Sequence, residues 1–247
     1  MAGALLLSAA CAAPPSSSSQ SSGQPAVPSA AARAPKRLTI GILQEPTTWA
    51  PWQTLTTAGG AIEVPYLVRR TLTTISADGT IQPQVAASVP SIDRGDWRIN
   101  PDGTMEQTWK LKPNVMWHDG QPLTADDFVF SYEMATYPAL PKPITLGFNL
   151  ITGVQALDSQ TVLISFKGAT PLAGQALFEP YPRHILGDAL AAGDVDRFMN
   201  NEYWTTAYVH AGPYKLANWQ PGTMQTFTAF PSFYDGAPKI TPSSSAS

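Results

Sequence analysis

Apolar and polar residues alternate along several short stretches of the chain, a pattern that indicates β-strands with one buried face. In "RLTIGIL" (37–43), Leu38, Ile40 and Ile42 fall on one side of the predicted strand. The alternation is clearest in "MEQTWKLK", where polar residues form the other side. The residues predicted to face the core there are Met105, Gln107, Trp109 and Leu111.

Turn-forming residues separate many of these stretches, so the strands are expected to pair as antiparallel hairpins. Two of the turns are Asp-Gly dipeptides, which favour the tight turns of short hairpins. The four predicted turns lie at 78–79, 102–103, 158–160 and 220–222. Helices are expected over 62–73, in a patch at 171–178 and within 187–200. The predicted fold class is therefore a mixed α+β or α/β body with several hairpins.

The stretch "VMWHDGQPLTADDFVFSYE" (115–133) contains several carboxylates but reads as the start of a helix. Thr124 and Asp127 have the spacing of a capping box, in which each satisfies the other's backbone amide. Asp126 and Asp127 fall in the first turn, where the helix dipole favours anions. The expected apolar stripe behind them is Phe128, Val129 and Tyr132.

The composition argues for a turn-rich globular body without a basic surface. Charged residues make up 13% of the chain, about half the usual share of ~25%, and the 24 Pro and 18 Gly fit many turns. The formal net charge is −3, and a chain with no basic patch is not expected to bind nucleic acid. We expect a monomer.

The single cysteine, Cys11, follows the apolar run "MAGALLLSAA". This resembles a secretory signal ending in a lipobox, so residues 1–11 are interpreted as a signal remnant with Cys11 as the lipid attachment site. A free thiol in a flexible leader is the alternative. Residues 12–36 are rich in Pro, Ser and Ala and predict a disordered tether, and residues 241–247 predict a disordered tail.

The sequence contains no catalytic motif that would indicate an enzyme. The chain has no phosphate-binding or dinucleotide loop and no metalloprotease motif. One cysteine excludes a Cys/His pair in the folded part and a zinc–thiolate site. The histidines, His118, His184 and His210, show no ligand spacing, so no metal or cofactor is expected. A metal-dependent hydrolase using His118 and Asp119 is the alternative, although a structural role for His118 is favoured.

The string "LKPNVMWHDGQPLTADDFVFSYE" resembles the signature region of the family 5 bacterial extracellular solute-binding proteins. "DGTIQPQVAASVPSID" and "AGPYKLANWQPGTMQTFTAFPSFYDGAPKI" resemble further family segments and keep the family's order. The resemblance covers about 37–240. It departs at Arg69-Arg70-Thr71, where the family usually carries Tyr-Glu-Gly, and at Val89, where the family has tryptophan.

The resemblance implies the fold of a periplasmic-binding protein of type II, with residues 37–240 as its N-terminal lobe and an inserted hairpin-rich subdomain. The family's proteins are longer, so the chain is expected to be an N-terminal portion without the second lobe. The implied function is the substrate-binding component of an ABC importer. Its implied location is outside the cytoplasm, either anchored to the membrane through Cys11 or periplasmic. Its implied partners are a peptide or other small solute and the permease subunits. Nickel, haem and oligosaccharide remain possible ligands.

In such proteins solutes bind in clefts formed by loops that follow strands, which directs attention to the loop after the first strand. The predicted ligand-binding residues are Glu45, Pro46, Thr47, Thr48, Trp49, Trp52 and Tyr214. The two tryptophans are expected either to line the cleft or to lie in the core, and Tyr214 is more often structural. Without a second lobe, we expect weakened solute binding. A remnant that docks on the permease without binding solute is the other alternative.

Overall fold

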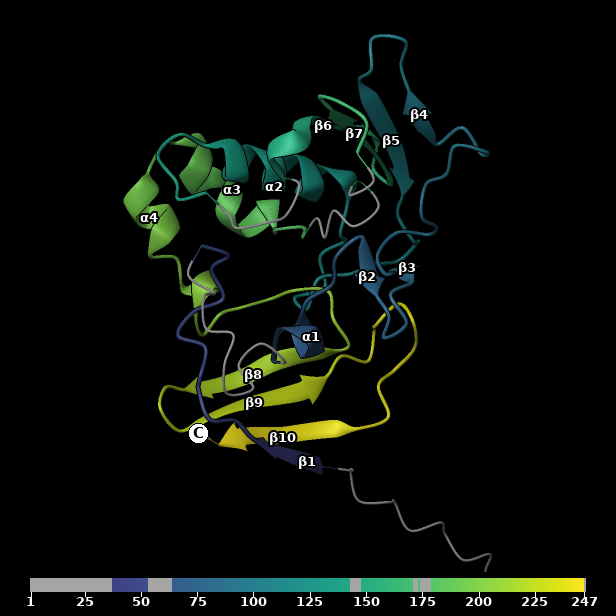
Figure 1. Ribbon diagram of the computed structural model, residues 1–247. Helices are drawn as coiled ribbons and strands as arrows, with labels where there is room; N and C mark the ends of the chain where they lie inside the picture. Colours follow the sequence, from purple (N-terminus) through teal and green to yellow (C-terminus); the bar gives the residue numbers. More distant parts are fainter. Residues whose placement is uncertain (1–36, 53–63, 143–147, 171–172, 174–178, 247) are drawn as a thin grey trace, which may run out of the picture. The chain divides into compact units, whose positions relative to one another are not determined.

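Figure 1 shows the protein as a computed structural model. The structure describes residues 37–52, 64–142, 148–170, 173 and 179–246, all within the unit Pro35–Ser247. The expectations for Cys11 and for the tether at 12–36 therefore lie outside the described residues, as does nearly all of the helical patch at 171–178. In the described part, no helix is long and apolar enough to cross a membrane.

Two of the predicted hairpins, with turns at 102–103 and 158–160, form a four-stranded antiparallel sheet. Its strands are β4 (Trp97–Ile99), β5 (Met105–Lys110), β6 (Ile151–Asp158) and β7 (Thr161–Phe166), in the order β4-β5-β7-β6. The predicted alternation is confirmed along β5, where Met105, Gln107 and Trp109 are buried and the residues between them are not.

Helix α2 (Ala125–Thr136) contacts this sheet through β6 and β7. The predicted capping box is confirmed: the Asp127 carboxylate accepts a hydrogen bond from the Thr124 amide at 2.9 Å. The helix buries more surface than the predicted stripe. Phe128 joins a cluster on the sheet, whereas Phe130 and Met134 join a second cluster. Helix α2 therefore has apolar contacts on two sides.

We call the cluster on the sheet the sheet core. It includes Trp109, Trp117, Phe128, Ile164 and Phe166. We call the second cluster the aromatic core. Its rings are Trp49, Phe130, Tyr181, Phe198, Tyr203, Trp204, Tyr208, Trp219 and Phe227.

A second four-stranded sheet has the order β1-β10-β9-β8. Its strands are β1 (Arg37–Gly41), β8 (Tyr214–Gln220), β9 (Met224–Ala229) and β10 (Thr241–Ala246). Strands β1 and β10 come from opposite ends of the described chain and run parallel, as the purple and yellow arrows in Figure 1 show. The structure differs here from the expected disordered tail at 241–247. Backbone pairing with β1 and β9 supplies the hydrogen bonds of β10, which do not depend on apolar side chains.

The remaining elements are short. Helix α1 (Val64–Val68) ends earlier than the predicted helix at 62–73, and the Val68 carbonyl accepts a hydrogen bond from the Gly212 amide at 2.8 Å. Strands β2 (Thr73–Ile75) and β3 (Ile81–Pro83) form the predicted hairpin at 78–79.

The chain forms two helices where one was predicted within 187–200. Helix α3 (Arg183–Ala191) begins before that range, and α4 (Val195–Met199) follows a break at Gly193, whose φ is +67°. A left-handed backbone of this kind ends a helix readily at glycine. Two short 3-10 turns, η1 (Phe148–Leu150) and η3 (Glu202–Trp204), complete the described elements named here.

Candidate functional site

The loop after β1, predicted to bind ligand, is held by side-chain and backbone hydrogen bonds to distant segments. The Glu45 carboxylate accepts hydrogen bonds from the Trp219 indole and from the Gly222 amide, the latter at 2.6 Å. The Thr48 hydroxyl donates to the Trp204 carbonyl at 2.9 Å. Glu45 and Thr48 are therefore occupied by contacts within the protein that fix the course of the loop.

The two tryptophans of this loop differ in exposure. Trp49 is 1% exposed, stacks on Tyr208 with ring centroids 4.5 Å apart, and belongs to the aromatic core. Trp52 is half-buried and lies edge-on to Trp204 at 4.9 Å. Trp49 is thus the core residue that one of the two expectations allowed, whereas Trp52 keeps part of its surface accessible.

The other predicted site residues also divide by exposure. Pro46 is buried and Thr47 is exposed. Tyr214 begins β8, is half-buried and packs against the aromatic core. The role of these residues in ligand binding remains a prediction, and Thr47 and Trp52 offer the accessible surface in the loop.

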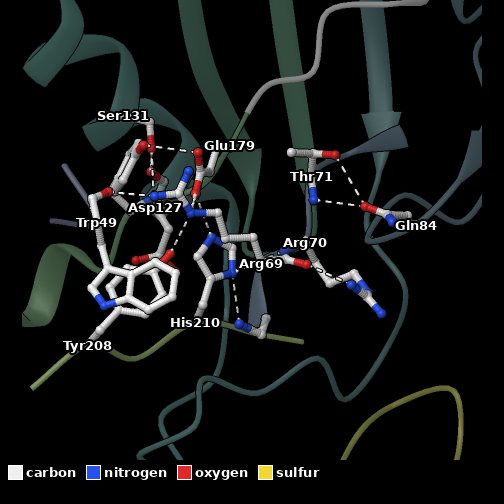
Figure 2. Close-up of polar contacts among 12 residues, drawn as sticks. Trp49, Arg69, Arg70, Thr71, Gln84, Asp127, Ser131, Glu179, Tyr208 and His210 are labelled. Atoms are coloured by element: carbon white, nitrogen blue, oxygen red, sulfur yellow. Dashed lines mark hydrogen bonds and ion pairs between the residues drawn. The ribbon is translucent and has the colours of Figure 1, made fainter. Parts of the chain in front are cut away.

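Beneath this loop lies a cluster of charged groups that the sequence did not single out as a site (Figure 2). Arg69 follows α1, and its Nε lies 3.1 Å from Oε1 of Glu179. The same guanidinium donates to the Tyr208 hydroxyl at 3.0 Å and to the Trp49 carbonyl at 2.5 Å. It lies 5.8 Å from the ring centroids of both Trp49 and Tyr208. Arg69 therefore connects α1 to the predicted ligand loop.

Glu179 is the carboxylate at the centre of this cluster. Its Oε2 accepts a hydrogen bond from the Tyr181 hydroxyl at 3.0 Å, and Nε2 of His210 lies 3.2 Å from Oε1. Burial alone would raise the pKa of Glu179, but the positive charge of Arg69 and the neighbouring His210 outweigh it and lower the pKa. Burial alone would lower the pKa of Arg69, but Glu179, Tyr208 and Tyr181 outweigh it and raise the pKa. The pair is therefore ionised at neutral pH.

Two buried histidines continue the network. Nδ1 of His210 accepts from the Ala211 and Arg70 amides at 2.8 and 3.2 Å, which assigns its proton to Nε2. Nδ1 of His118 accepts from the His210 amide at 3.1 Å, so its Nε2 donates to the Gly212 carbonyl at 3.0 Å. Burial lowers the pKa of His210 and lowers the pKa of His118 to about 3. Both rings are neutral and bind backbone groups.

The alternative of a hydrolase using His118 with Asp119 is wrong. Both ring nitrogens of His118 are bound to backbone groups, whereas Asp119 lies 2.7 Å from Nε2 of His184. Among the residues that the structure describes, no group of three or more His, Cys, Asp or Glu side chains could hold a metal ion. The favoured structural role of His118 is confirmed by these contacts.

Asp127 has a wider structural role than capping α2. In addition to the Thr124 amide, its carboxylate accepts from the Trp117 indole at 3.2 Å and from the Arg183 amide at the start of α3 at 3.1 Å. The buried carboxylate thus receives hydrogen bonds at the beginning of two helices. The carboxylates near His118 therefore stabilise the scaffold, and the candidate site lies around the Glu45–Trp52 loop and Arg69.

In the sequence, Arg69 stood out only as a departure from the family pattern. Nothing there identified Glu179, Tyr181 or Tyr208 as site residues. One signal was present: Arg69 directly follows the apolar helix "VPYLV", and a charge at such a place needs a partner. The partner could not be chosen from sequence, because Glu179 lies 110 positions further along the chain (179 − 69).

Comparisons with known proteins agree with this architecture. The family model of the bacterial extracellular solute-binding proteins, family 5 Middle, matches residues 80–242. A putative ABC transporter peptide-binding protein of Brucella ovis is 27% identical over 146 residues, which cover 58% of this chain and 27% of that protein. The oligopeptide-binding protein AppA of Bacillus subtilis is 24% identical over 209 residues, which cover 82% of this chain and 35% of AppA.

Solved structures also match most of the chain. AppA in complex with a nonapeptide superimposes with a TM-score of 0.68 at 22% identity, covering 86% of this chain and 40% of AppA. The binding protein MoaA of A. tumefaciens R10, in complex with mannopinic acid, gives a TM-score of 0.65 at 26% identity and the same coverage. The chain thus spans less than half the length of these relatives. The family model covers well over half of the chain, and the chain belongs to the family 5 bacterial extracellular solute-binding proteins.

Proposed function

We propose that this chain takes part in capturing a peptide or similar small solute outside the cytoplasm and presenting it to the permease subunits of an ABC importer. The observation that carries the proposal is the family match over residues 80–242. The fold supports it, because the structures that share this fold include binding proteins in complex with peptides and with mannopinic acid.

In this proposal the Glu45–Trp52 loop forms part of the wall against which the solute lies. The loop is held rigidly by Glu45 and Thr48, and its accessible residues Thr47 and Trp52 present one hydroxyl and one broad ring. A fixed wall lowers the entropy lost on binding, and an aromatic surface buries apolar area of many different solutes. The arrangement suits a receptor that binds without chemical change.

Closure over the solute requires a second surface. In hinge-closing binding proteins, the ligand is enclosed between two bodies that shut around it. We therefore propose that residues 37–240 contribute one side of the cleft, and that these residues alone bind solute more weakly than a two-lobed receptor. The chain's coverage of about 40% of the AppA and MoaA structures supports this proposal.

Isothermal titration of the chain with a defined pool of short peptides tests the proposal. We expect saturable binding in the micromolar range or weaker, abolished or reduced by Trp52→Ala. The exposed apolar residue Ile99 supplies a control, Ile99→Ala, in the sheet subdomain. Submicromolar affinity would contradict the single-sided cleft, and the absence of saturable binding would contradict solute capture by this chain.

Membrane attachment through Cys11 forms part of the proposal, because a tethered receptor stays close to its permease. Metabolic labelling of cells with an alkyne fatty acid, comparing the natural chain with Cys11→Ala, measures it directly. Label retained by Cys11→Ala would contradict attachment at this residue. Co-purification with permease subunits and the mass of the purified chain in solution test the proposed partner and the proposed monomer.

A further inference from the structure

Arg70 has surroundings that differ from those of its neighbour Arg69. Its Nη1 donates to the Tyr66 and Arg69 carbonyls at 3.0 and 2.7 Å, which fixes the direction of the side chain. Figure 2 shows the guanidinium pointing away from the Arg69–Glu179 pair. Its central carbon lies 5.4 Å from the ring centroid of Phe233. Arg70 is thus held in place by backbone carbonyls and an aromatic face.

Arg70 makes no direct ion pair with a carboxylate in the described part of the chain. Asp235 attracts the charge of Arg70 but binds Nζ of Lys112 at 2.9 Å, so one carboxylate serves two cations. The Tyr234 side chain also forms a hydrogen bond with Arg70. Lys112 lies 5.0 Å from the ring centroid of Tyr234, and the rings of Phe233 and Tyr234 are in contact at 4.6 Å. Two cations therefore lie against a pair of aromatic rings, with one carboxylate between them.

Two cations that share one carboxylate leave an excess of positive charge, which an anion from outside the protein would offset. Burial lowers the pKa of Arg70 from its ordinary value, although the group stays protonated at neutral pH. The bonds to the two carbonyls use Nη1, and the Nε and Nη2 edge of the guanidinium is the geometry that matches a carboxylate with two parallel hydrogen bonds. The sequence agrees, because Arg70 stands where the family pattern carries glutamate and so reverses the charge.

We propose that Arg70 is an anion-recognition residue that binds a carboxylate of the captured solute. The proposal rests on the proposed function and narrows the solute to one that carries a carboxylate near an apolar or aromatic group. Phe233 supplies the apolar contact.

The test compares one synthetic tripeptide pool prepared in two forms, as free acids and as C-terminal amides, by isothermal titration at constant ionic strength. We expect the natural chain to bind the free acids about tenfold more tightly, the factor that one charge-assisted pair contributes. Arg70→Gln is expected to reduce this ratio to below twofold by weakening the binding of the free acids more than that of the amides. Arg70→Lys, which keeps the charge but loses the planar fork, is expected to retain part of the preference.

The matched control is Arg98→Gln, which removes an exposed arginine of β4 that pairs with Glu106. It is expected to keep the full preference. Thermal unfolding of each variant separates loss of fold from loss of recognition, because the proposal predicts an unchanged midpoint for Arg70→Lys.

Four results would overturn the assignment. Equal binding of acids and amides by the natural chain, or a preference that survives Arg70→Gln, removes Arg70 from recognition and leaves the proposed function intact. Displacement of the free acids by inorganic phosphate but not by acetate identifies a phosphate site instead. Failure of both pools to bind rejects the proposed function, and the assignment with it.

Discussion

The sheet core and the aromatic core hold the protein together in different ways. In the sheet core, strands β4 to β7 pair in regular ladders, and the buried rings rest on a face that alternates residue by residue. In the aromatic core, segments from distant parts of the chain meet through ring contacts around the Arg69–Glu179 ion pair. Regular pairing of strands therefore builds the support, whereas the candidate binding wall depends on a few specific long-range contacts.

Loss of one partner of the buried ion pair is the largest effect that we expect. Glu179→Leu leaves the Arg69 guanidinium, whose side chain is 16% exposed, without its carboxylate. Breaking a buried pair costs roughly 3–5 kcal/mol of the free energy of unfolding, and partial exposure places this pair near the lower end. Urea denaturation measures the loss.

The double variant Arg69→Met/Glu179→Leu tests whether the charges themselves stabilise the aromatic core. It removes both charges, so we expect it to be more stable than Glu179→Leu. A double variant less stable than either single variant would show that the pair stabilises the aromatic core beyond the cost of burying its charges.

The second-largest loss of stability is expected for a substitution at Gly212, where α1 meets the segment before β8. A Cβ atom at this position would lie 2.3 Å from the Val68 carbonyl oxygen, and a backbone atom cannot rotate away. We expect Gly212→Ala to lower the free energy of unfolding by about 3 kcal/mol, the upper part of the range for overpacking. Gly153→Ala in β6 is the control, because a Cβ there meets nothing within 4 Å. Equal losses of the free energy of unfolding for Gly212→Ala and Gly153→Ala, measured by urea denaturation, would contradict this prediction.

The smallest predicted effect is a dependence of stability on pH that comes from His118. Burial lowers its pKa to about 3 in the folded chain, against an ordinary value of 6.5 in the unfolded chain. As the pH falls below 6.5, the unfolded chain binds the proton first, so the free energy of unfolding decreases. The decrease is about 1.4 kcal/mol for each pH unit.

Urea denaturation at pH 7.5 and pH 5 measures this contribution. His118→Asn, which keeps an acceptor for the His210 amide and does not titrate, is expected to lose less stability between the two pH values than the natural chain. His210 titrates in the same direction, so part of the dependence remains in the variant. An unchanged dependence in His118→Asn would exclude His118 as a source.

Patterns of residues that are close in sequence predicted the helix and strands that support the site. The capping box at Thr124 and the alternation along β5 follow from residues that are close in sequence, and the structure contains both. The strand β10 was missed, because "TPSSSA" has no apolar pattern and its pairing depends on strands far away in the chain.

The site itself was predicted less completely. The Glu45–Trp52 loop follows a strand that the sequence reveals, but the burial of Trp49 depends on Tyr208, which no local pattern connects to it. The Arg69–Glu179 pair was missed for the same physical reason, because electrostatic partners meet only after the chain has folded. Two features of the sequence pointed to the cluster: the departure from the family pattern at Arg69, and the place of Arg69 directly after the apolar helix α1.

The bonds that hold the candidate loop also constrain when it can form. Thr48 and Trp204 are separated by 156 positions, and Glu45 and Gly222 by 177. A ribosome makes the loop before its partners, so the loop lacks these contacts until Trp204 and Gly222 have been made. Contacts of such sequence separation slow folding, because a long segment must first be brought back on itself. The newly made chain therefore reaches its native form only after residues beyond Gly222 have emerged.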